Sequence, residues 1–324
     1  MSPLLPRMLP VAIALLLSAC SKSDSDAGQK AHTAGPTATP ELSVPFGEGS
    51  TALGRDIPEE GSPEGPTAFV VDASGRIHVL DGVSDAIKVF EGKQQVASVA
   101  LPSRPFDDLE LLDDGSYALL DLHSEPGITF VTASGKITAL VQLDPALVPE
   151  PSLVTALTRI DGALWVEVED ERLVKVATLA GTLAEPEVAD GKLLRDGATL
   201  GVKVNGDATL DITESAAAGE TAKTFAHLTF PERVAECTLL ASGPNGRVLV
   251  VARLDAEQAD PEQDLDETQV LVSLDPSGKE QWRSVLPPLP GLVRSYRPVR
   301  VGADGNVYAL TTSDTSATIV KVTP

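Results

Sequence analysis

The residue types that do chemistry are sparse in this sequence, and their spacing fits no common catalytic motif. The four histidines stand apart, so there is no His-x-x-x-His pair, and the chain has neither a Cys-x-x-Cys pair nor a Gly-x-Ser-x-Gly nucleophile motif. We expect His78 to pack inside a strand and His123, in Asp121-Leu-His-Ser-Glu125, to lie in a surface loop where an imidazole can meet a ligand. The pattern predicts no catalytic residue set.

Carboxylates are the second group of side chains that could take part in chemistry, and they are densest in the segment 255–268. Asp264, Asp266 and Glu267 stand close together there, and carboxylate oxygens are the ligands that Ca²⁺ prefers. The segment lacks the Gly and the distal Glu of an EF-hand loop, so we favour a solvated charged loop. The sequence predicts no metal and no cofactor, with a Ca²⁺ site as the alternative.

The charge balance excludes some partners. The chain carries 25 Lys and Arg against 47 Asp and Glu, a formal net charge of −22, which opposes binding to nucleic acid and to an anionic membrane surface. Beyond Cys20 the chain holds only Cys237, so no internal disulfide is expected. Cys237 lies in an apolar run and is expected to be a buried, inert thiol.

The elements that must position these residues follow from a repeated turn. Asn-Gly and Asp-Gly pairs favour tight hairpins, because both central residues of such a turn take a positive φ. A Ser, Asp or Asn precedes Gly and then an alternating apolar run at Gly75, Gly115, Gly162, Gly206, Gly246 and Gly305. In the fourth unit Asp196-Gly197 is an alternative to Asn205-Gly206. A repeat of roughly 40–50 residues is typical of propeller blades, so we predict an all-β fold, a six-bladed β-propeller of four-stranded antiparallel blades over residues 41–324.

The two ends of the chain predict how this ring closes. The sixth unit supplies three strands before the chain stops at Pro324, while residues 41–46 precede the first unit and have no blade of their own. An unpaired edge is avoided in closed folds. We therefore predict that residues 41–46 form the outermost strand of the last blade.

The first unit resembles an NHL-type repeat. Phe69-Val-Val-Asp-Ala-Ser-Gly-Arg-Ile-His-Val-Leu-Asp81, followed by Ile87-Lys-Val-Phe90, is similar to that family's pattern of apolar run, Asp-x-x-Gly, apolar pair and Asp. The match weakens along the chain, where Val168, Ala252 and Thr311 replace the acid. The resemblance implies a six-bladed propeller, a scaffold that hosts many functions.

The amino terminus resembles a bacterial lipoprotein signal. An apolar core follows Arg7, and Leu17-Ser-Ala-Cys20 is similar to a lipobox, which implies that Cys20 is acylated and becomes the first mature residue. We assign residues 1–19 to the signal peptide and residues 20–40 to the acylated Cys and a flexible tether. The expected partner is the lipid bilayer, and the expected location is the outer membrane, facing the periplasm or the cell surface.

Propeller geometry predicts where a ligand binds. The loops after each second strand and the connections into each first strand ring one mouth of the central channel. Those segments supply a mixed-charge candidate ligand face made of Glu64, Asp81, Arg104, Asp107, Asp121, His123, Arg233, Arg294, Tyr296 and Arg297. Asp81 and Asp121 have a competing role, which is to cap the backbone of the loop that follows each of them.

Three functions are compatible with these observations. We favour a membrane-anchored, non-catalytic binding or scaffold lipoprotein that presents the propeller at the cell envelope to a protein or a small polar ligand. The first alternative is a lactonase-like, Ca²⁺-dependent hydrolase, which needs cation ligands from several blades. The second is a component of an envelope assembly complex.

Overall fold

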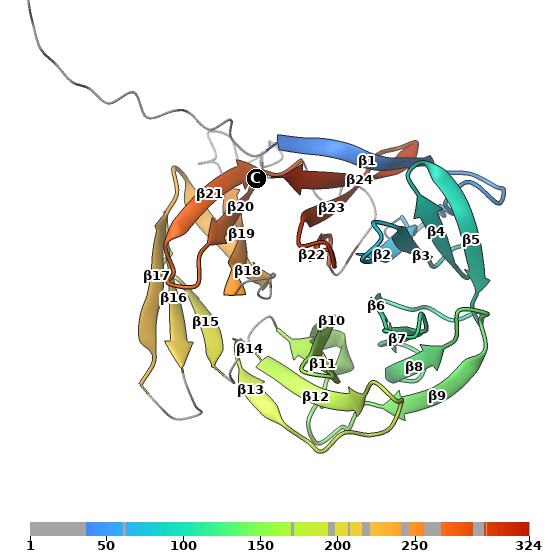
Figure 1. Cartoon of the computed structure of the whole chain (residues 1–324), viewed down its shortest axis with the longest axis horizontal. Coiled ribbons are helices and arrows are strands. Elements are labelled where there is room, and N and C mark those ends of the chain that lie inside the picture. The colour runs from blue at the N-terminus through green and yellow to red at the C-terminus, as the bar shows by residue number, and fades with distance from the viewer. Residues whose placement is uncertain are drawn as a thin grey trace, which may run out of the picture. The chain divides into compact units, whose positions relative to one another are not determined.

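Six four-stranded antiparallel sheets form the blades of a ring (Figure 1). The computed structural model describes residues 37–60, 63–169, 172–193, 198–206, 208–215, 221–240, 246–255, 267–287, 295 and 297–323. In this part of the chain helix is confined to short 3₁₀ turns such as Pro151–Leu153, and no helix is long and apolar enough to cross a membrane. The predicted all-β, six-bladed propeller is confirmed.

Each blade runs from an innermost strand near the ring axis to an outermost one. Blade one consists of β2 (Pro66–Val71), β3 (Ile77–Asp81), β4 (Ala86–Glu91) and β5 (Gln94–Ala100). Blade two consists of β6 (Asp108–Leu111), β7 (Tyr117–Asp121), β8 (Gly127–Val131) and β9 (Ile137–Gln142). Blade three consists of β10 (Val154–Ile160), β11 (Ala163–Val168), β12 (Arg172–Thr178) and β13 (Val188–Asp190). Blade four consists of β14 (Lys192–Leu193), β15 (Thr199–Val204), β16 (Thr209–Ser215) and β17 (Lys223–Thr229). Blade five consists of β18 (Arg233–Leu240), β19 (Val248–Asp255), β20 (Glu267–Leu274) and β21 (Glu280–Val285). Blade six consists of β22 (Val299–Val301), β23 (Val307–Thr312), β24 (Ser316–Thr323) and β1 (Thr37–Pro45).

The repeated turns join first to second strands in five blades. Gly75 and Gly115 take φ values of 82° and 81°, the left-handed conformation that glycine adopts without steric cost. The strands that follow are buried on both faces, as β3 and β7 show along their whole length. This pattern arises because each second strand lies between two neighbouring blades.

The fourth unit departs from the main prediction. Asn205-Gly206 links β15 to β16, which are the second and third strands of that blade. The first strand, β14, ends at Leu193, so the alternative hairpin at Asp196-Gly197 is the one that falls between the first and second strands, at residues outside the described part. The error arose because the turn signal marks any hairpin and does not specify which pair of strands it joins.

The ring closes through its amino-terminal strand, as predicted. β1 pairs with β24 from Thr37↔Thr323 to Pro45↔Ser316, and it begins at Thr37, four residues inside the predicted tether. Leu42 and Val44 are buried in the cluster shared by blades six and one. The chain after β1 continues this fastening, because Arg55 contacts the carbonyl oxygen of Asp314 on blade six.

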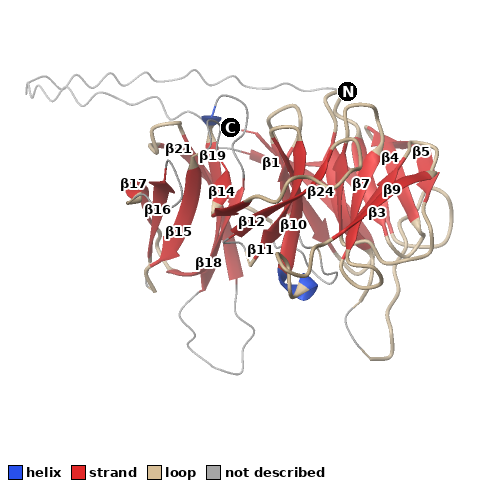
Figure 2. Ribbon diagram, turned by 90° about the horizontal axis from the view of Figure 1, so that it is seen from below, coloured by secondary structure: helices blue, strands red, loops and turns tan. Residues whose placement is uncertain are grey.

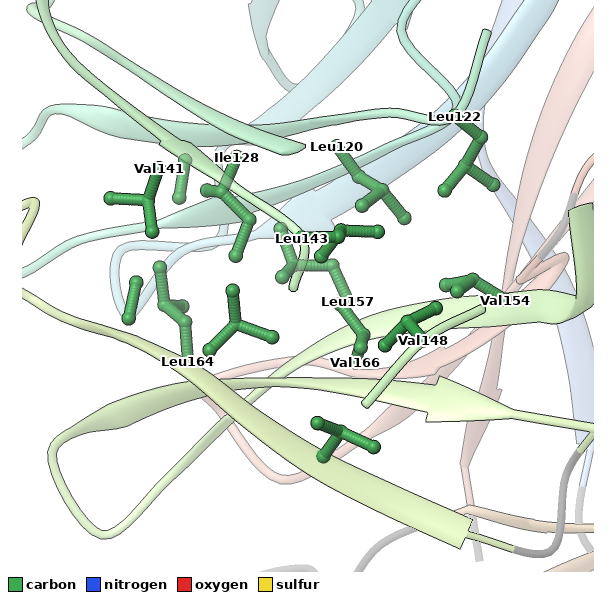
Figure 3. Close-up of a cluster of buried hydrophobic side chains, with 14 of the residues drawn as sticks. Leu120, Leu122, Ile128, Val141, Leu143, Val148, Val154, Leu157, Leu164 and Val166 are labelled. Atoms are coloured by element: carbon green, nitrogen blue, oxygen red, sulfur yellow. The ribbon is translucent and has the colours of Figure 1, made fainter. Parts of the chain in front are cut away.

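Apolar side chains between blades form the core. The cluster between blades two and three contains Leu120, Ile128, Leu157, Leu164 and Val166, which face one another across the gap between the two sheets (Figure 3). The alternation of the strands supplies such a face on each side of a blade.

The strands run between two loop-bearing ends (Figure 2). The hairpin face carries the turns between first and second strands. The loop face carries the turns between second and third strands and the connections into the next blade. The pairing of Pro66 with Asp81 places the start of β2 and the end of β3 together on the loop face. The acidic segment also starts there, because Asp255 ends β19 and Glu267 begins β20.

Candidate functional site: the loop face and the channel

The described members of the predicted ligand face lie at the loop face, but they do not form one ring. Asp81, Asp121, Arg104 and Asp107 are tied into blades one and two, and Arg297 reaches the channel. Glu64 is exposed beside its backbone bridge to Asp56, and Arg233 forms an ion pair with Asp255 at 2.9 Å on blade five. Arg294 and Tyr296 lie outside the described residues.

Asp81 has a structural role in blade one. Its carboxylate is fully buried, accepts hydrogen bonds from the amides of Gly54 (2.9 Å) and Ser84 (3.2 Å), and pairs with Lys88 Nζ at 2.8 Å. Lys88 also donates to the carbonyl oxygen of Ala52. The carboxylate therefore fixes the segment after β1 against the first blade, and its lone pairs are engaged within the protein.

Asp121 caps the loop after β7. Its Oδ1 accepts the backbone N–H groups of His123 (2.9 Å) and Ser124 (2.8 Å), which is the competing role expected from the sequence. The side chain is fully buried, and Arg104 Nη1 lies 3.5 Å from its Oδ2 and 3.4 Å from Glu125. This cap holds the 122–125 loop in one conformation.

The held loop aims His123 at a buried carboxylate. His123 Nε2 lies 3.1 Å from Asp107 Oδ1, while Asp107 Oδ2 accepts the Leu122 amide at 2.9 Å. Burial raises the pKa of the Asp107 carboxyl, and the nearby charge of His123 opposes that rise. The imidazole itself is 57% exposed. The Asp107 carboxylate therefore orients one side of the ring, and the other side is open to solvent. We call Arg104, Asp107, Asp121 and His123 the blade-two cluster.

A second polar group, the channel network, crosses the ring axis. Asp108 and Glu110 on β6 meet Arg300 on β22: Arg300 Nη1 lies 3.1 Å from Glu110 Oε1, and Arg300 Nη2 contacts Asp108. Arg297 joins them at 3.2 Å from Glu110 and 3.6 Å from Asp108. Two guanidinium groups and two carboxylates thus join blade six to blade two.

Backbone groups extend the channel network to blade three. The Leu157 amide on β10 donates to Asp108 Oδ2 at 2.8 Å, and Arg297 donates to the Leu157 carbonyl oxygen. Ser295 Oγ donates to the Thr67 carbonyl oxygen on β2 at 2.7 Å. Blades six, two and three are therefore linked through one polar centre, and Ser295, two residues before Arg297, adds a separate contact to blade one.

Burial shapes the titration of this centre. It lowers the pKa of the Arg300 guanidinium to about 9, which leaves the group charged at neutral pH, and it raises the pKa of Glu110 against the opposing charge of Arg297. Arg300 Nε is buried without a hydrogen-bond partner. The two carboxylates that face the axis from β6 are committed to guanidinium groups.

Sequence reasoning missed Asp108, Glu110 and Arg300. A signal was present: Asp108 and Glu110 alternate with Leu109 and Leu111, and Arg300 stands between two valines. In an innermost strand such alternation places charged side chains toward the axis. The prediction considered only loops and connections and so passed over the first strands.

Metal ligands do not gather in the described part of the chain. No three His, Cys, Asp or Glu side chains there are placed to hold one ion. The weak candidates Asp264 and Asp266 lie outside the described residues, and Glu267 is described only as the first residue of β20. The Ca²⁺ alternative has no support from Asp81 and Asp121, because backbone amides and the cations Lys88 and Arg104 engage their carboxylates.

Comparisons with known proteins bear on the fold. No family model matches the chain, so the NHL resemblance stays a prediction, and no curated protein matches either. Among solved structures, a member of the DUF4221 family from Bacteroides vulgatus is 9% identical with a TM-score of 0.53, covering 89% of this chain and 98% of that one. A luciferin-regenerating enzyme is 12% identical with a TM-score of 0.48 (90% and 96% covered), and regucalcin from Agrobacterium tumefaciens is 14% identical with a TM-score of 0.43 (83% and 94% covered). At such an identity the likeness to the DUF4221-family structure shows a shared fold alone, and the six four-stranded sheets make this chain a six-bladed β-propeller.

Proposed function

We propose that this protein is a lipid-anchored propeller that binds a partner at the cell envelope without transforming it. The channel network carries the proposal. A hydrolytic cation site or a general base needs a carboxylate with free lone pairs, whereas Asp108 and Glu110 are held by Arg297 and Arg300. Asp81 and Asp121 are likewise engaged by backbone amides and cations. Polar groups so arranged stabilise a rigid scaffold.

The surface offered to a partner is the exposed rim of the blade-two cluster. His123 is 57% and Glu125 is 52% exposed, and both stand on a loop that Asp121 fixes. A fixed polar loop recognises a protein or a small polar ligand at little entropic cost.

A photo-cross-linking residue tests this surface. Placed at position 123 or 125 of the full chain in cells, it should yield a cross-linked adduct. Placed at Ala73, which is exposed on the hairpin face, it should yield none. Equal adducts from both faces, or adducts from Ala73 alone, contradict the assignment of the loop face.

The anchor has its own test. Cys20→Ala should leave the signal peptide uncleaved at that site and remove the protein from the outer-membrane fraction. Cys237→Ala is the matched control and should fractionate like the natural protein. If Cys20→Ala fractionates with the outer membrane, the lipid anchor is wrong, and the binding surface can still be judged by cross-linking.

The His123–Asp107 pair favours a second candidate, a propeller hydrolase. An exposed imidazole oriented by a buried carboxylate has the geometry of a general base. The leading proposal expects no turnover of lactones or phosphotriesters, with or without Ca²⁺. Turnover that is lost in His123→Gln and retained in His227→Gln, another half-exposed histidine beside an Asp, would establish the enzyme instead.

A further inference from the structure

We propose that the propeller ring opens between its third and fourth blades. The apolar contacts between blades carry the first argument. At the other five boundaries the buried clusters take side chains from both blades, as the cluster of Figure 3 does for blades two and three. The cluster on the side of blade three that faces blade four holds only Ala163, Trp165 and Leu173 among the described residues, all from blade three. We call this boundary the seam.

The side of β15 and β16 that faces away from blade five is polar at the residues that the structure describes. Leu200 and Leu210 point toward blade five, where they join the cluster shared with that blade. By the alternation of the strands, Gly201, Lys203, Asp211 and Thr213 point the other way, toward the seam, and none of them is buried. The described residues of β15 and β16 therefore give blade three no apolar surface to pack against.

Blade four also sits differently from its neighbours. Its innermost strand β14 has two residues and lies beside β12, and β15 lies beside β13 and β18, whereas β6 contacts β2 and β10 directly. The third strand of blade three thus meets the first strand of blade four, and its fourth strand meets the second, so the fourth blade is shifted outward by about two strands relative to the third. The shift takes it away from the channel network, which joins blades six, two and three.

Two buried polar atoms on blade three face the seam without a partner. These atoms are Trp165 Nε1 and Glu167 Oε1, on residues two apart along β11. The alternating residues of the strand, Leu164 and Val166, face blade two, so Trp165 and Glu167 face the seam. Trp165 is 3% and Glu167 is 2% exposed. An unpaired buried donor or acceptor destabilises the closed state, and water satisfies both atoms once the seam opens.

An ion pair holds the seam shut. Lys192 on β14 contacts the other oxygen of Glu167, and both side chains are largely buried. This contact spans the two blades where apolar packing does not, so its loss should favour opening. Folded proteins open locally where few apolar contacts are shared between neighbouring elements.

Thiol labelling of the full chain under native conditions tests the proposal. In a Cys20→Ser, Cys237→Ser background, Ala163→Cys places one thiol on the seam side of blade three. Ala177→Cys is the matched control, since Ala177 is also buried, lies on the neighbouring strand and faces blade two. We expect Ala163→Cys to react with a disulfide-exchange reagent at least about tenfold faster, at a rate insensitive to low urea. Equal rates that rise together with urea would show global unfolding only and overturn the proposal.

The ion pair provides an independent arm. Glu167→Gln should speed labelling of Ala163→Cys severalfold and leave Ala177→Cys unchanged. Arg159→Met is the control, because Arg159 pairs with Asp113 across the boundary of blades two and three. If Glu167→Gln leaves the Ala163→Cys rate unaltered, static exposure rather than opening explains the labelling, and the proposal fails.

Discussion

At the residue scale, His78 is buried inside the fold, as expected, but it has a specific partner on each side. Its Nδ1 lies 2.9 Å from Tyr117 Oη on blade two, and its Nε2 lies 3.3 Å from Asp72 within blade one. Burial lowers the pKa of His78 below 6.5 against the opposing charge of Asp72, and burial raises the pKa of Tyr117 to about 12. The imidazole is therefore neutral in the folded protein at pH 7.

This neutrality predicts a pH dependence of stability. Because the folded pKa of His78 lies below the unfolded one, the unfolded state binds the proton more readily. Stability should fall as the pH drops below 6.5 toward the folded pKa. Urea midpoints at pH 7.5 and 5.5 measure the loss, and His78→Gln should make it smaller. An unchanged loss in His78→Gln would assign it to other groups.

The channel network makes a second prediction at this scale. Arg300→Met leaves Asp108 and Glu110 with Arg297 alone, and breaking a buried pair by removing one partner costs about 3–5 kcal/mol. Urea denaturation should show a loss of this size. Adding Asp108→Asn and Glu110→Gln should recover part of it, because the uncompensated charge is then gone. A single-variant loss under about 1 kcal/mol would mean that water already solvates the centre.

At the element scale, the glycines of the outer turns position neighbouring blades. Gly135, between β8 and β9, takes a φ of 84°, and a Cβ there would overlap the Ala100 carbonyl oxygen at the end of β5. Gly181 and Gly278 approach the preceding blade in the same way, near Phe130 and Phe225. The turn of one blade thus rests against the outer strands of the blade before it.

Gly135→Ala and Gly115→Ala separate turn strain from blade contact. The two glycines have φ values of 84° and 81°, but a Cβ on Gly115 meets no atom within 4 Å. Gly115→Ala should cost about 1–2 kcal/mol, the usual cost of a left-handed conformation for an L-residue. Gly135→Ala should cost clearly more because blades one and two must also separate. Equal losses in thermal unfolding would show that the contact carries no energy.

At the scale of the whole molecule, β1 fastens the ring by joining the chain ends. A truncation that removes residues 21–36 leaves β1 intact and should barely change the melting temperature. A truncation through Pro40 removes four of its pairings with β24 and should lower stability moderately. A truncation through Phe46 also removes the buried Leu42 and Val44 and should cost several kcal/mol, since each buried apolar side chain contributes about 1.5–3 kcal/mol. Equal melting temperatures for the first and last would show that the ring is closed by other contacts.

The sequence by itself determined the blade count, five of the six inner hairpins and the closing strand. These features are local: a positive φ at Gly75 depends on two adjacent residues, and the buried faces of β3 follow from alternation over five. The capping role of Asp121 was equally predictable, because the backbone N–H groups that donate to its carboxylate are two and three residues away.

Only the tertiary structure decided which charges meet. Asp108 and Arg300 are 192 residues apart in the sequence, and their contact depends on the curvature of the whole ring. The displacement of the fourth blade also depends on long-range contacts. Turn residues influence how strands pair within one sheet, whereas the side chains that pack between two sheets determine how the sheets are placed. Local propensities therefore specified the blades, and long-range packing specified the channel network and the displacement of the fourth blade.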